Sequence, residues 1–100
     1  MAALTYKFEK ATYAIEPLGK AGAKMTITYT PKIFAMLTFH ADGSSEVDTT
    51  HIPPRYLTPG VVEAEQKKYA ALITADQPRN AFRSLQKHFD ARKLKKALKT

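Results

Sequence analysis

Hydrophobic and polar side chains alternate along the first half of the chain with the two-residue period of β-strands. Leu4, Tyr6 and Phe8 are separated by polar residues, and residues 11 to 15 continue the alternation in the opposite phase. Because successive side chains of a strand point to opposite faces, the change of phase at residues 9 and 10 predicts either a bulge in one long strand or a tight hairpin. We favour the bulge, since neither position holds glycine, asparagine or proline.

Two more strands are predicted after the first clear break, which falls at residues 17 to 24 and contains a proline and two glycines. Met25, Ile27 and Tyr29 alternate with threonine and indicate a strand. A Thr-Pro-Lys sequence then interrupts the pattern, because proline cannot donate a backbone hydrogen bond to a sheet. Residues 33 to 40 form a nearly continuous apolar run, which we expect to be the most buried strand.

The sequence Ala-Asp-Gly-Ser-Ser predicts a turn before a further strand over residues 46 to 52. A two-residue loop would place apolar residues opposite acids on one face of the hairpin. A loop with an odd number of residues instead pairs Phe39 with Val47 and leaves His40 opposite Glu46 on the other face. We therefore predict the odd loop.

Two helices are predicted in the second half of the chain. Thr58 supplies an N-cap and Pro59 a first helical residue, so we expect a helix from Pro59 to Ala75. Asp76 repeats the capping signal and predicts a second, basic helix from about residue 78. The apolar stripe expected to face the core from the first helix is Val62, Tyr69, Leu72 and Ile73.

This order of elements predicts a single α+β domain over residues 1 to 100. We expect a small, mostly antiparallel sheet of three to five strands, followed by two C-terminal helices packed on one face. The chain has no cysteine, which excludes disulfides, zinc-thiolate sites and thiol nucleophiles. We expect a cytoplasmic protein without a membrane partner, because no apolar segment is long enough to span a bilayer.

The charge is concentrated at one end of the chain. Residues 1 to 78 hold eight basic and eight acidic residues, whereas residues 79 to 100 hold eight basic residues and only Asp90, which accounts for the net charge of +7. Such a field attracts phosphates, so the leading hypothesis is a non-catalytic module that binds nucleic acid without sequence-specific readout. The expected contact set for nucleic acid or an acidic partner is Arg79, Arg83, Lys87, Arg92, Lys93, Lys95 and Lys96.

The last helix contains two apolar stripes that cannot enter one core. At about 100° per residue, Leu94 and Leu98 lie roughly opposite Phe82 and Phe89. Either the helix breaks near Asp90 or it continues past the domain, and we favour continuation because no glycine or proline marks a break. The two leucines would then contact a protein partner or a second copy of the chain. The alternative function is accordingly a small interaction or inhibitor protein, such as a phage-type modulator that docks on an acidic or nucleic-acid-binding surface of host machinery.

Other candidate chemistry is weaker. His40 with Glu46 is the best acid/base pair, but a hydrolase would also need a pocket and a nucleophile, so we do not expect an enzyme. The three histidines lack the spacing of metal ligands, and we expect neither a metal nor another cofactor. The tyrosines of the strands could stack on bases, although closing the edge of a small core is the commoner role. A helix-turn-helix formed by the last two elements is a further, weaker hypothesis.

Overall fold

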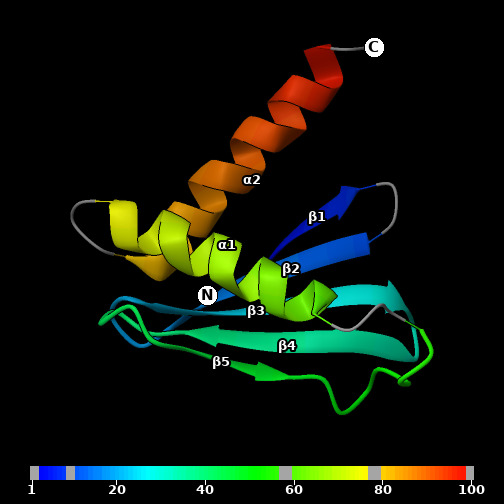
Figure 1. Ribbon diagram of the computed structural model, residues 1–100. Helices are drawn as coiled ribbons and strands as arrows, with labels where there is room; N and C mark the ends of the chain where they lie inside the picture. Colours follow the sequence, from blue (N-terminus) through cyan, green and yellow to red (C-terminus); the bar gives the residue numbers. More distant parts are fainter. Residues whose placement is uncertain (1–2, 9–10, 57–59, 77–79, 99–100) are drawn as a thin grey trace.

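The protein is a small α+β domain, seen in a computed structural model that describes residues 3–8, 11–56, 60–76 and 80–98 (Figure 1). Its five strands form one antiparallel sheet in the order β1-β2-β3-β4-β5, and both helices cover the same face of that sheet (Figure 1). The predicted fold class is therefore confirmed. The elements are β1 (Leu4–Phe8), β2 (Ala11–Leu18), β3 (Gly22–Thr30), β4 (Ile33–Phe39), β5 (Ser45–Asp48), α1 (Val61–Ala75) and α2 (Ala81–Leu98).

The first two strands form a hairpin, so the predicted bulge is wrong. β1 and β2 are antiparallel, with Tyr6 opposite Tyr13 and Phe8 opposite Ala11. Residues that lie directly opposite one another share a face of the sheet, so the hairpin brings both phases of the apolar alternation to the face that the helices cover. A bulge would also have turned both phases to one face, but within a single strand, and the antiparallel pairing of β1 with β2 excludes it.

The core lies between the covered face of the sheet and the two helices. β3 and β4 alternate like their neighbours: Leu37 and Phe39 of β4 are buried, whereas Phe34 and Met36 are only half-buried. The apolar run of β4 is thus no more buried than β3, because the helices cover only one face of the sheet (Figure 1). The largest fully buried side chains are Tyr69, Phe39, Phe89, Ile15, Met25, Ile27, Leu37, Ile73 and Leu85.

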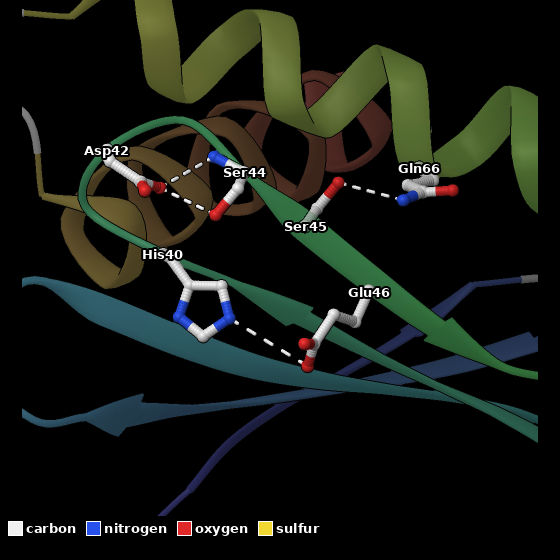
Figure 2. Close-up of polar contacts among 6 residues, drawn as sticks. All are labelled: His40, Asp42, Ser44, Ser45, Glu46 and Gln66. Atoms are coloured by element: carbon white, nitrogen blue, oxygen red, sulfur yellow. Dashed lines mark hydrogen bonds and ion pairs between the residues drawn. The ribbon is translucent and has the colours of Figure 1, made fainter.

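The loop between β4 and β5 has an odd number of residues, as predicted, but the pairing of the two strands is shifted by two residues. Phe39 lies opposite Ser45 rather than Val47, and Val47 lies opposite Leu37. The Asp42 carboxylate accepts hydrogen bonds from the Ser44 N–H (2.8 Å) and hydroxyl (2.6 Å), and this local turn closes the loop earlier than expected (Figure 2). The apolar residues of the two strands still share the covered face, as the odd loop required.

The helix α1 begins at Val61, with Gly60 as its N-cap at a φ of 91°. The predicted start at Thr58 and Pro59 lies outside the described residues. Val62, Tyr69 and Ile73 of the expected stripe are buried, but Leu72 is only half-buried. α1 also reaches the edge of the sheet, where the Gln66 side chain donates a hydrogen bond of 2.8 Å to the Ser45 hydroxyl (Figure 2).

The helix α2 begins later than predicted and has a different cap. The Asn80 side-chain oxygen accepts a hydrogen bond of 3.0 Å from the Arg83 N–H, which is the capping interaction of an N-cap residue. Asp76, the predicted cap, accepts a hydrogen bond of 2.7 Å from the Ser84 hydroxyl instead. The Ala81 N–H donates to the Ala21 carbonyl (2.8 Å), which joins the start of α2 to the loop between β2 and β3.

We predict that replacing Asn80 with alanine destabilises the domain by about 1 kcal/mol, because the first turn of α2 loses its side-chain acceptor. Urea unfolding followed by circular dichroism measures this change. Asn80→Asp is the matched control, since aspartate provides an equally good cap and should retain most of the stability. Equal losses in the two variants would contradict the assignment of Asn80 as the cap.

Candidate nucleic-acid interface

The helix α2 continues without a break to Leu98, and its second half projects beyond the sheet and α1 (Figure 1). We call residues 91 to 98 the projecting half of α2. The buried part ends at Phe89, which is fully buried, and every residue from 91 to 98 is exposed. Leu94 and Leu98 retain 62% and 78% of their accessible surface. The predicted continuation past Asp90 is therefore confirmed.

An aromatic cluster fixes the direction of this projecting half. The centre of the Phe89 ring lies 5.2 Å from the ring centre of Tyr6, 5.1 Å from that of Tyr13 and 5.5 Å from that of Tyr69. Such contacts stabilise a core beyond the area that they bury. Because Tyr6 and Tyr13 belong to β1 and β2, the cluster holds α2 across the first hairpin of the sheet.

A hydrogen bond next to this cluster involves Asp90, the one acidic residue of α2. The Tyr6 hydroxyl donates to the Asp90 carboxylate over 2.8 Å. Burial, together with this hydrogen bond and the charge of Asp90, raises the pKa of Tyr6 to about 12. Asp90 is the one acidic residue between residues 79 and 100, so this carboxylate faces β1 rather than the cations that follow it.

The basic residues of α2 form two groups instead of one surface. The Arg92 guanidinium lies 4.1 Å from the centre of the Phe8 ring and the Lys96 ammonium 5.9 Å from it, while Lys93 lines a cleft beside β1. Arg83 and Lys87 are exposed on the roughly opposite side of the helix. Lys95 is exposed on the projecting half together with the first group, whereas Arg79 lies outside the described residues.

The cations of α2 have no acidic partner in the described part of the chain. There, the structure contains one ion pair, between His40 and Glu46, and none that involves α2. Helical surfaces that only need solubility usually mix charges of both signs. The projecting half of α2 therefore presents uncompensated positive charge.

The predicted pair of His40 and Glu46 does form, with 3.8 Å between the imidazole Nε2 and a carboxylate oxygen (Figure 2). The two residues are diagonal neighbours, because Thr38 lies directly opposite Glu46. Both side chains are largely exposed, so solvent screens the interaction and it contributes little to stability. In the segments that the structure describes, no three histidine or acidic side chains lie close enough to hold a metal ion.

A buried polar cluster lies between α1 and α2, and the sequence pattern did not predict it. Glu65 Oε2, the Tyr69 hydroxyl and His88 Nε2 are buried without a hydrogen-bond partner among the described residues. Burial, and then the charge of Glu65, raises the pKa of Tyr69, while burial together with the charges of Lys68 and Arg92 lowers the pKa of His88. The spacing of Glu65 and Tyr69 along α1 is visible in the sequence, but their proximity to His88 depends on how the helices pack.

The aromatic residues of the sheet do not form an exposed stacking surface. Tyr6 and Tyr13 are buried under α2, as expected of residues that close a core. Tyr29 packs against Tyr56, with 5.9 Å between ring centres, and Phe34 is covered at 4.3 Å by the ring of His51. The candidate interface is therefore the positively charged half of α2 and not an aromatic platform.

No family model, curated protein or solved structure matches this chain. Among the described residues, neither helix is long and apolar enough to cross a membrane.

We predict that Tyr6→Phe lowers the free energy of unfolding by about 1 kcal/mol at neutral pH, because it removes the hydrogen bond to Asp90. The raised pKa of Tyr6 adds a pH dependence: this stabilisation is complete below pH 10 and is lost as the pH rises towards 12. Denaturant titrations between pH 7 and pH 11 would measure both effects. Asp90→Asn keeps an acceptor and is the control; a Tyr6→Phe variant as stable as the wild type would contradict the role of this bond.

Proposed function

We propose that the protein binds the phosphate backbone of nucleic acid, without catalysis, through the projecting half of α2. The contacting residues are Arg92, Lys93, Lys95 and Lys96, and Arg83 and Lys87 add charge on the other side of the helix. The observation that carries the proposal is that these cations are exposed on a projecting helix with no acidic partner among the described residues.

The physical basis is electrostatic. A nucleic-acid backbone concentrates negative charge and bound counterions, and each phosphate neutralised by lysine or arginine releases counterions. The packing of Arg92 over Phe8 supports this role, because a guanidinium already held against a ring loses less conformational freedom on binding. The proposed interactions address the backbone alone, so binding without sequence preference is expected.

We predict that changing Arg92, Lys93, Lys95 and Lys96 together to glutamine weakens nucleic-acid binding strongly. The slope of log K against log salt should fall by about 3, because each phosphate that the protein no longer neutralises reduces it by roughly 0.7 to 0.9. Fluorescence anisotropy with labelled single-stranded and duplex oligonucleotides at several salt concentrations measures this slope. Glutamine retains a long stem and a good helix propensity, so α2 should persist.

The matched control removes the same charge elsewhere. Lys20, Lys32, Arg55 and Lys67 are exposed and lie outside α2, and changing these four to glutamine should reduce the slope far less. Equal effects in the two variants would mean that only the net charge matters, which contradicts a site on α2.

A second candidate function is docking on another protein, as an interaction or inhibitor module. The observation that favours it is the exposure of Leu94 and Leu98, which lie one turn apart on the projecting half and do not pack against the core. Large apolar side chains held away from the domain are typical of contacts with a partner helix or groove.

We predict that the double change Leu94→Ser and Leu98→Ser leaves stability within about 0.5 kcal/mol of the wild type, because both side chains are exposed. Binding to a protein partner, or dimerisation, should weaken, while binding to oligonucleotides should not. Capture from host lysate with and without nuclease treatment, followed by thermal unfolding of the variant and the wild type, tests this. Loss of folding would place the leucines in the core and contradict the second function.

A further inference from the structure

The strand β1 is a free edge of the sheet. Its only neighbour in the described sheet is β2, and its sequence, Leu-Thr-Tyr-Lys-Phe, contains no proline. An edge of this kind offers unpaired backbone N–H and C=O groups to another chain. The other free edge, β5, is one residue shorter and exposes Glu46 and Asp48.

The ladder fixes which backbone groups of β1 are free. The His40 N–H donates to the Ser44 carbonyl over 2.9 Å, so these two residues occupy a hydrogen-bonded position of the ladder, although the Ser44 N–H donates to Asp42 instead of His40. Bonded and non-bonded pairs alternate along antiparallel strands, and a residue bonded on one side does not bond on the other. The pairing of β4 with β5, β3 with β4, β2 with β3 and β1 with β2 carries this alternation across the sheet from one edge to the other. It follows that the even-numbered residues of β1 form their hydrogen bonds with β2. Thr5 and Lys7 therefore direct four backbone groups to the free edge.

The surroundings of this edge are positively charged. A cleft of about 290 Å³ runs along it, lined by residues 5 to 8 of β1 and by Lys93 from the projecting half of α2. Lys7 is exposed on the open face of the sheet, and Arg92 and Lys96 lie over Phe8 on the other face. A strand added here would have cations on both of its sides.

We propose that the β1 edge binds an extended, acidic segment of another protein, which pairs with Thr5 and Lys7 as a sixth strand. Backbone hydrogen bonds supply affinity in this mode of binding, and pockets or charges beside the edge select the side chains. A lysine on an edge strand opposes pairing with basic chains, including a second copy with its net charge of +7, but favours carboxylates. The proposal does not depend on nucleic-acid binding, because the backbone of β1 carries it.

The test uses a labelled synthetic octapeptide in which glutamate alternates with threonine, and the same peptide with lysine in place of glutamate. The wild-type protein should bind the acidic peptide and not the basic one. Thr5→Pro removes an N–H that the sheet does not use, so the domain should still fold. This variant should bind the acidic peptide at least about tenfold more weakly, whereas the control Thr5→Val should stay within about twofold of the wild type.

A second measurement covers a failure of Thr5→Pro to fold. In the wild type, the amide protons of Thr5 and Lys7 should become protected from solvent exchange when the acidic peptide binds. Two results would overturn the proposal: unchanged exchange at both amides, or a folded Thr5→Pro variant that binds the acidic peptide as well as the wild type does. Either would mean that the peptide is held only by its attraction to lysines. Self-association of the wild type that protects these amides, without peptide binding, would assign the edge to a second copy and also overturn it. Oligonucleotide binding by Thr5→Pro should equal that of the wild type, which separates this test from the proposed function.

Discussion

The packing of Phe89 against the first hairpin is the interaction on which the rest of the structure depends. This ring is fully buried among Tyr6, Tyr13 and Tyr69, and so joins α2 to both the sheet and α1. The hydrogen bond between Tyr6 and Asp90 follows directly after it along the helix. Together the two contacts end the buried part of α2 and fix the direction in which its remaining residues project.

This anchor also determines the electrostatics of the projecting half. Asp90 is the only acidic residue of α2, and its carboxylate accepts the hydrogen bond from Tyr6 of β1. The charged groups of Arg92 and Lys96 lie over the Phe8 ring at the edge of the core, and both residues remain exposed. The same packing brings Lys93 to the cleft beside β1, so the proposed phosphate-binding residues and the proposed strand-binding edge are neighbours.

The local pattern predicted the strands well because apolar alternation reports directly which side chains share a face. The alternation around Tyr6 and Tyr13 identified both strands, but it could not distinguish a bulge from a hairpin, since both reverse the phase. The same holds for β4 and β5. The odd number of residues in their loop could be predicted, because it keeps acidic residues away from the core. Which residues pair could not be predicted, because that depends on the turn that Asp42 and Ser44 form.

The sequence by itself determined the fold class, the continuity of α2 and the exposure of Leu94 and Leu98, because these follow from local periodicity and from the absence of helix-breaking residues. The tertiary structure alone decided how the cations are divided. The sequence places Arg92 and Lys87 in one charged helix, but contact with Phe8 draws Arg92 to the hairpin while Lys87 faces solvent. Helical spacing fixes the angular positions of the side chains relative to one another. Only the packing of Phe89 fixes which side of the helix faces the sheet.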